Sequence, residues 1–179
     1  MVNSTSLSPD VATILETVQR REEYDHSISI EDHYIQLVVC LLKECYYAFP
    51  GESIQEIVTV PAITYVPGVP ACLLGVIYVR GNIESVLDLR QVLGLPAGPI
   101  SACSRIALGQ VGEFRSGLLV DSIEDVLEIS EDEILKPALD IGMAGTAFVA
   151  GETMYNGRPL IVLDLCKIFD TLLVPPDTQ

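Results

Sequence analysis

The chain has 179 residues, and its 25 acidic and 10 basic side chains leave a formal net charge of −15. Such a surface repels phosphate backbones and anionic lipid, which argues against nucleic acid and membrane surfaces as partners. No apolar run approaches the roughly 18 to 20 residues of a membrane-spanning helix, and no signal peptide is visible at the start, so we expect a cytoplasmic protein without direct membrane insertion.

The N-terminal part of the chain predicts one helix. Ser8, Pro9 and Asp10 supply a capping hydroxyl, a proline at the first helical position and an acid in the first turn. Four apolar residues then fall on one helical stripe: Val11, Ile14, Leu15 and Val18. The stripe is open to two interpretations, packing on the chain's own body or binding a partner or a second copy. Residues 1–33 are therefore assigned to an added N-terminal helix and a polar linker.

Short strands dominate the chain after His33. We expect strands at 34–42, 45–49, 76–79, 83–87, 105–111, 117–120, 121–129, 147–155 and 159–163, and a turn with another short strand within 54–60. Tight turns are expected at Lys43-Glu44, at Arg80-Gly81-Asn82, over 112–116 and at Asn156-Gly157, and helical turns at 88–93, 130–135 and 164–169. A proline-rich extended crossing covers 61–70. The pattern favours a mainly β fold of small closed or half-closed barrels.

One tetrapeptide occurs twice in matching surroundings. Val86-Leu87-Asp88-Leu89 and Val162-Leu163-Asp164-Leu165 each follow a hairpin and precede a helical turn. This repetition predicts two related β subdomains. In the first copy the apolar residues are interrupted by Glu84 and Ser85, which we expect to face solvent or a partner.

Residues that could carry catalysis or bind a metal are sparse. His26 and His33 lie near the linker without a nucleophile motif beside them, and no phosphate-binding loop is present. Eight carboxylates lie between Asp121 and Asp140, but they lack the EF-hand spacing and alternate with apolar residues, as along a half-exposed strand. We therefore predict no catalytic residue, no metal and no cofactor. Five cysteines without a C-x-x-C pair are expected to be buried small hydrophobes: Cys40, Cys45, Cys72, Cys103 and Cys166.

Four blocks carry a resemblance to a known family. They are Cys45-Tyr46-Tyr47-Ala48-Phe49-Pro50 leading to Ile54-Gln55-Glu56-Ile57; Val66-Pro67 with Gly75 through Arg80-Gly81; Val86-Leu87-Asp88-Leu89-Arg90; and Gly117-Leu118-Leu119-Val120-Asp121 running to Asp125-Val126-Leu127. In this order and at these separations they resemble the CheW family, the coupling proteins of bacterial chemosensory arrays. The resemblance covers residues 34–172 and leaves the N-terminal helix and a 173–179 tail outside.

The resemblance implies two intertwined five-stranded β-barrel subdomains of SH3-like form and no catalysis. It implies an adaptor that couples a chemoreceptor to a CheA-type histidine kinase in chemotaxis or related motility signalling. One surface would dock the regulatory domain of the kinase, and a groove near the subdomain junction would hold the cytoplasmic tip of the receptor. The protein would be cytoplasmic and associated with membrane-anchored receptor arrays.

Site residues follow from the matched blocks. The resemblance assigns Ile54, Glu56 and Gly75 to the kinase-facing region, Arg80 with Gly81 to receptor and kinase coupling, and Ile106, Leu108 and Val120 to the receptor groove. Ile54 and Glu56 are two residues apart, so they share one face in a regular strand. The alternative for Arg80 is a structural ion pair with a local carboxylate such as Asp88 or Glu84.

Two other functions remain open on the sequence. A small-ligand-binding β-barrel, or a hydrolase using the acidic cluster, would need a sizeable interior cavity with convergent polar groups. A homotypic scaffold would assemble through the N-terminal helix.

Overall fold

The structure is a computed structural model that describes residues 33–137 and 145–173. Contacts divide the chain into residues 1–33 and 34–179, and every strand described here belongs to the second unit. The predicted N-terminal helix, and with it the predicted self-association, lies outside the described residues. Within the described ranges, no helix is both long enough and apolar enough to cross a membrane.

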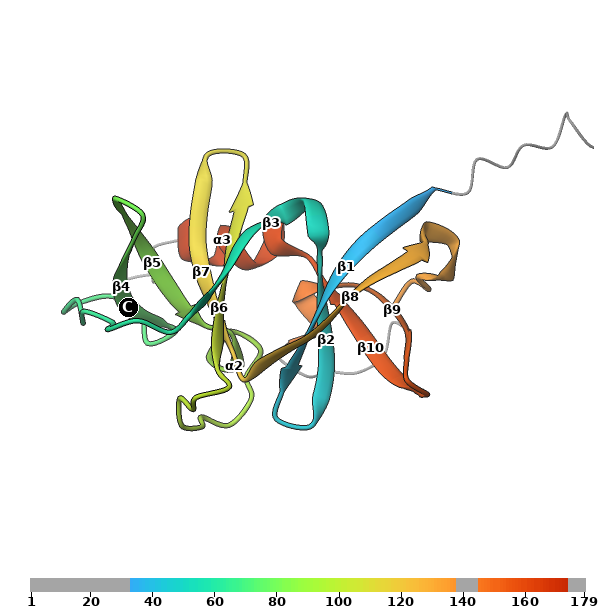
Figure 1. Cartoon of the computed structure of the whole chain (residues 1–179), viewed down its shortest axis with the longest axis horizontal. Coiled ribbons are helices and arrows are strands. Elements are labelled where there is room, and N and C mark those ends of the chain that lie inside the picture. Colours follow the sequence, from blue (N-terminus) through green and yellow to red (C-terminus); the bar gives the residue numbers. More distant parts are fainter. Residues whose placement is uncertain (1–32, 138–144, 174–179) are drawn as a thin grey trace, which may run out of the picture. The chain divides into compact units, whose positions relative to one another are not determined.

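Ten strands of the described chain form two five-stranded sheets. Sheet A has the order β8 (Ser122–Ser130), β1 (Tyr34–Leu42), β2 (Cys45–Pro50), β10 (Arg158–Leu163) and β9 (Val149–Tyr155). Sheet B has the order β3 (Ile54–Thr59), β6 (Arg105–Val111), β7 (Phe114–Val120), β5 (Asn82–Asp88) and β4 (Leu73–Val79). The chain starts sheet A, builds all of sheet B and returns to complete sheet A, so the two subdomains are intertwined as predicted (Figure 1).

Short helical elements connect the strands. They are η1 (Gly51–Ser53), α2 (Leu89–Val92), η2 (Glu131–Glu133), η3 (Thr146–Phe148) and α3 (Leu165–Leu173). The repeated tetrapeptides lead into α2 and α3. The Asp88 carboxylate accepts the Arg90 N–H at 3.1 Å, and the Asp164 carboxylate accepts the Lys167 N–H at 3.2 Å. Each copy of the aspartate thus satisfies a free N–H at the start of a helix.

The two sheets match residue by residue beyond the repeated tetrapeptide. Each has one parallel pair of strands, β5 with β7 and β10 with β2, and the other neighbours are antiparallel. Each has a bulge at the start of an edge strand, at 54–56 in β3 and at 123–125 in β8. An isolated bridge crosses the gap between the edge strands of each sheet, Thr64 with Val76 and Leu135 with Glu152.

The expected barrels are not closed, which corrects the sequence-based picture. Strands β3 and β4 do not pair with each other, and neither do β8 and β9, so only the isolated bridge links the edges of each sheet. In sheet B the reason lies in the crossing from β3 to β4. Its residues Pro61, Pro67 and Pro70 have no N–H to donate, so a continuous ladder cannot form there.

Three apolar clusters fill the structure. One lies inside sheet A, including Leu37 and Leu160, and one lies inside sheet B, including Ile77 and Ile106. The third joins the sheets and contains Phe49, Leu87, Leu163 and Phe169. Helix α3 follows sheet A in sequence but packs against β6 of sheet B, where Gly109 leaves room for the Phe169 ring. This shared core makes one folding unit of the two sheets.

The structure differs from the sequence-based expectation at the β6–β7 turn and at Glu84. Residues 114–116, expected in a turn, begin β7, and the β6–β7 turn is only Gly112-Glu113. Glu84 is buried and pairs with Arg115 at 3.3 Å, whereas Ile83 is exposed. The register explains this exchange, because Ile83 pairs with exposed Tyr78 and Glu84 pairs with buried Ile77.

The cysteine expectation is wrong for most of the five. Cys40 is buried in the shared core, Cys72 is half-buried, and Cys45, Cys103 and Cys166 are exposed; all five are free thiols. Burial, with smaller contributions from Asp121 and Glu124, raises the pKa of the Cys40 thiol. Cys40 alone therefore behaves as the small buried hydrophobe that was expected.

Candidate functional site: two docking places

The β4–β5 turn brings two of the predicted site residues together. Arg80 and Gly81 have φ angles of 47° and 90°, which confirms the predicted tight turn. The Arg80 side chain is 79% exposed, and its Nη2 lies 2.8 Å from Oε1 of Glu56 on β3. Arg80 thus bridges the open edge of sheet B, and its partner is neither of the two carboxylates suggested by the sequence.

Ile54 and Glu56 do not share a face. Ile54 pairs with Gly109 and Glu56 with the adjacent Leu108, so the intervening Gln55 is an extra residue in a β-bulge. Ile54 packs on the core between the sheets, whereas Glu56 follows Leu108 toward the inside of sheet B and stays 24% exposed at its edge. The bulge directs the carboxylate toward Arg80.

Gly75 has a structural function that needs no partner. It is buried with φ 142°, and a Cβ at this position would lie 2.2 Å from the carbonyl oxygen of Thr64. Only glycine allows the proline-rich crossing to pair with β4 at this point. Gly75 therefore fixes the edge of sheet B, and its place in kinase binding stays a prediction.

Large apolar side chains are exposed on the strands that flank this edge. Tyr78 and Ile83 are cross-strand partners in the β4–β5 hairpin and are 70% and 73% exposed. Ile57 of β3 and Tyr65 beside the Thr64 bridge are exposed as well. We call these four residues, with the Glu56–Arg80 pair, the sheet B edge. Exposed aromatic and aliphatic groups around an ion pair have the composition of a protein-binding surface.

The predicted receptor-groove residues are not accessible. Ile106, Leu108 and Val120 are all fully buried because β6 and β7 are inner strands with a packed core on each face. The open hollow at the junction lies at the ends of the same hairpin, beside Ser104 and Asp121. This junction pocket has a volume of about 770 Å³ and is lined by Lys43, Glu44, Cys45, Arg90, Ala97, Gly98, Pro99, Ser101, Ser104 and Asp121.

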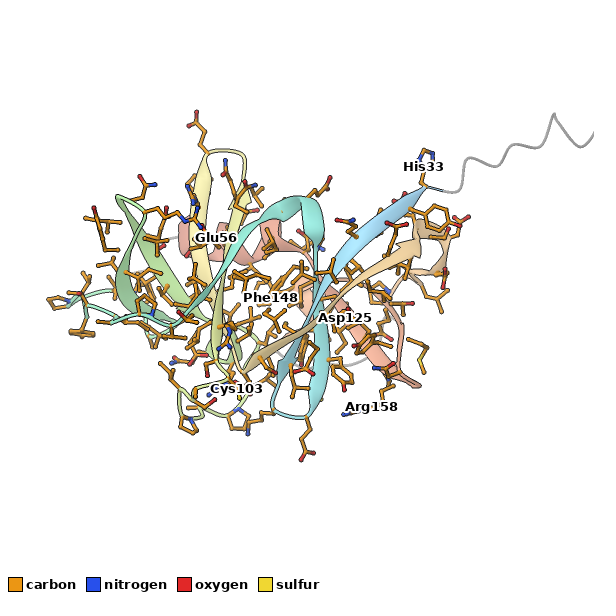
Figure 2. All side chains as sticks on the ribbon, viewed as in Figure 1. His33, Glu56, Cys103, Asp125, Phe148 and Arg158 are labelled. Atoms are coloured by element: carbon orange, nitrogen blue, oxygen red, sulfur yellow. The ribbon has the colours of Figure 1, made fainter. Side chains whose placement is uncertain are left out.

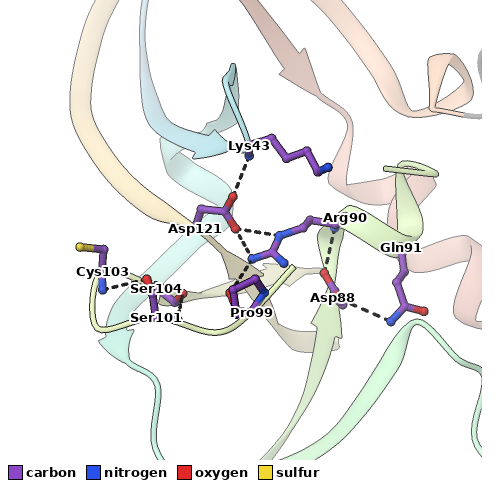
Figure 3. Close-up of polar contacts among 9 residues, drawn as sticks. All are labelled: Lys43, Asp88, Arg90, Gln91, Pro99, Ser101, Cys103, Ser104 and Asp121. Atoms are coloured by element: carbon purple, nitrogen blue, oxygen red, sulfur yellow. Dashed lines mark hydrogen bonds and ion pairs between the residues drawn. The ribbon is translucent and has the colours of Figure 1, made fainter. Parts of the chain in front are cut away.

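An ion pair that the sequence did not predict lies in the junction pocket. Nε of Arg90 donates to Oδ1 of Asp121 at 2.7 Å, and Nη2 contacts the same oxygen (Figure 3). Both residues belong to the matched blocks, but 31 positions separate them, so no local pattern pairs them. The Arg90 side chain is 4% exposed and the Asp121 side chain 26%.

The acidic strand gives no sign of a metal site. Glu124, Asp125 and Glu128 are exposed along β8, as predicted for a half-exposed strand. Among the described residues, no group of three or more His, Cys, Asp or Glu side chains is placed to hold a metal ion. Every buried side-chain nitrogen or oxygen atom in the described ranges has a hydrogen-bond partner. Apolar clusters fill the interiors of both sheets, and the one buried carboxylate inside sheet B, Glu84, is paired with Arg115.

Fold and surfaces together define a class of protein: a duplicated two-sheet β scaffold with an exposed apolar edge and a junction pocket. The CheW-like domain family model matches residues 36–172. The chain belongs to the CheW-like family of chemotaxis scaffold proteins.

Individual relatives agree with this assignment. The chain is 25% identical over 148 residues to the chemotaxis protein CheW of Treponema pallidum (strain Nichols). The match covers 80% of this chain and 87% of the relative. It is 32% identical over 118 residues to a probable chemotaxis protein CheW of Rhizobium etli, covering 65% and 76%. The crystal structure of the scaffolding protein TtCheW from Thermoanaerobacter tengcongensis is similar with a TM-score of 0.71 at 30% identity, covering 77% of this chain and 94% of that one.

Proposed function

We propose that this protein is a non-enzymatic cytoplasmic adaptor that couples a chemoreceptor to a CheA-type histidine kinase within membrane-anchored receptor arrays. The observation that supports the proposal is that one scaffold carries both an exposed apolar edge with an ion pair and a separate junction pocket. An adaptor needs two docking places, each with apolar area for affinity and a few charges for register. The sheet B edge and the junction pocket meet this requirement.

The kinase regulatory domain binds at the sheet B edge in this proposal. Tyr78 and Ile83 offer the apolar area, and the Glu56–Arg80 pair offers charges of both signs beside it. Because Arg80 is mostly exposed, its loss removes little from the folded state but removes a charged group from the interface.

The cytoplasmic tip of the receptor binds at the junction pocket in this proposal. The pocket is walled by the β1–β2 turn of sheet A and by the segment that leads into β6 of sheet B. A second hollow of about 370 Å³ lies beyond Ser101 and Ser104 and includes the exposed Ile100. Two adjoining hollows with apolar walls suit the side chains of a helical segment.

Calorimetric titration of the full chain with the cognate kinase regulatory domain tests the proposal. We expect Arg80→Glu to weaken binding by about tenfold or more, because it reverses a charge within the interface. Asn156→Glu is the matched control, since Asn156 occupies the equivalent turn of sheet A, and it should bind like the wild type. Wild-type protein that binds neither kinase domain nor receptor fragment would exclude the adaptor function.

A further inference from the structure

Arg90 stands out as a buried cation in a short surface helix. Its side chain is 4% exposed, and its guanidinium contacts three groups: the Asp121 carboxylate, the Pro99 carbonyl oxygen at 3.3 Å from Nη2, and Gly98. A Cβ on Gly98 would lie 2.4 Å from Nη1 of Arg90, so the loop backbone packs directly on the guanidinium. Arg90 therefore fixes the loop over residues 97–101, which forms one wall of the junction pocket.

Asp121 fixes the opposite wall. Its Oδ2 accepts the backbone N–H of Lys43 at 2.7 Å, and its own N–H donates to the Leu41 carbonyl oxygen at 3.1 Å. Lys43 has a φ of 57°, a conformation that costs free energy in a non-glycine residue unless other contacts stabilise it. The carboxylate thus holds the β1–β2 turn of sheet A while its other oxygen holds Arg90 (Figure 3).

The duplicated half of the chain lacks this arrangement. Arg90 is the second residue after the repeated Asp88, and the residue in the same position after Asp164 is Cys166, which is exposed. Helix α3 nevertheless forms and packs. The fold of a subdomain therefore does not require an arginine at this position. The role of the ion pair is specific to the junction pocket.

We propose that Arg90 and Asp121 are positioning residues for receptor docking. Together they hold the β1–β2 turn and the 97–101 loop apart as two fixed walls, so that the junction pocket is open before the receptor arrives. A preformed site avoids the ordering cost that binding otherwise carries. The inference rests on the proposed function, because it takes the receptor tip as the occupant of this pocket.

Two variants with a conservative control test the inference in the full-length protein. Arg90→Met keeps the volume of the side chain but loses the charge, Asp121→Asn keeps the shape, and Arg90→Lys keeps the charge but loses the two-pronged geometry. For each variant, we would measure affinity for a helical receptor-tip fragment and for the kinase regulatory domain. Amide hydrogen exchange at Lys43 would report on the β1–β2 turn without any partner.

We expect Arg90→Met and Asp121→Asn to weaken receptor-fragment binding about tenfold or more, with kinase-domain binding within twofold of wild type. Arg90→Lys should recover part of the receptor affinity, and Lys43 exchange should speed up in Asp121→Asn. Equal losses for both partners would show a merely structural role, and unchanged receptor binding would also overturn the inference. If the wild-type protein binds both partners and the variants bind the receptor fragment as tightly as the wild type, the proposed function stands and the positioning role is wrong.

Discussion

The open edge of sheet B carries the pair Glu56 and Arg80, whereas the equivalent positions in sheet A carry Asp125 and Asn156. Both turns have left-handed residues, with φ angles of 47° and 50°, and Figure 2 shows Glu56 and Asp125 on the two separate sheets. In sheet A the Asp125 carboxylate accepts a hydrogen bond from the Tyr155 hydroxyl at 3.2 Å, where Glu56 of sheet B has an arginine as its partner. The two sheets share one backbone arrangement. The side chains that differ at equivalent positions can therefore give the two halves different docking surfaces.

The strongest test of the shared plan is a pair of core truncations. Leu87 and Leu163 occupy the same position in the two copies and are both fully buried in the core between the sheets. Leu87→Ala and Leu163→Ala should each lower the free energy of unfolding by about 3 to 4 kcal/mol, because each leaves a cavity in a packed interior. Urea denaturation measures both. A loss at only one position would show that the two halves do not share one core.

Two glycines at equivalent positions show how the backbone differs between the edges of the two sheets. Gly75 and Gly151 both lie beside an isolated bridge, but only Gly75 has a positive φ. An added Cβ would lie 2.2 Å from a backbone oxygen at Gly75 and 2.9 Å from one at Gly151. Gly75→Ala should therefore cost about 2 to 3 kcal/mol of unfolding free energy.

Gly151→Ala should cost less, because its φ lies outside the left-handed region and the nearest backbone atom is 2.9 Å from the added Cβ, compared with 2.2 Å at Gly75. Thermal melts of the two variants give the comparison. An equal or larger loss at Gly151 would contradict the account of how the crossing pairs with β4.

The interiors of the two sheets differ by one buried charge. Sheet B has Glu84 where sheet A has Leu160, and Glu84 depends on Arg115 for its partner. Arg115→Ala should lower the free energy of unfolding by about 2 kcal/mol, since it leaves a carboxylate buried and unpaired. Glu84→Leu, which copies sheet A, should be neutral or stabilising. A clear loss of stability in Glu84→Leu, seen by denaturant titration, would mean that the two interiors are not interchangeable.

The smallest expected effect concerns alkaline pH. Sheet A has buried Cys40 where sheet B has Gly109, and burial raises the pKa of this thiol above its usual value of 9.0. The unfolded thiol ionises above about pH 9 while the folded one stays neutral, so stability is full below that pH and falls as pH rises. The loss should approach about 1.4 kcal/mol per pH unit.

Denaturation at pH 8 and pH 10 measures this dependence. Cys40→Ala should remove that share of the pH dependence. If Cys40→Ala shows the same pH dependence of the unfolding free energy as the wild type, Cys40 is not its source.

Patterns within one segment were predictable, and contacts between distant segments were not. The β1–β2 hairpin and the positive-φ turns at Arg80-Gly81 and Asn156-Gly157 followed from local residue types, and the repeated tetrapeptide revealed the duplication. The matching bulges at 54–56 and 123–125 escaped notice because these segments share residue classes but few identities.

The burial of Ile106 and Leu108 could not be predicted from the sequence for a related reason. The run Ile106-Ala107-Leu108 is apolar throughout, so nothing distinguishes an exposed face from a buried one. Only the sheet order shows that β6 is an inner strand with both faces covered. The Arg90–Asp121 pair likewise depends on tertiary structure, which brings α2 next to the start of β8.

The proposed function requires one scaffold to bind two partners at separate surfaces. A labelled receptor-tip fragment would be titrated into the protein alone and into the protein saturated with the kinase regulatory domain. We expect receptor binding in both titrations, and one sedimenting species that contains all three components. Loss of receptor binding upon saturation with the kinase domain would mean that the partners compete for one surface, and the two-surface proposal would be wrong.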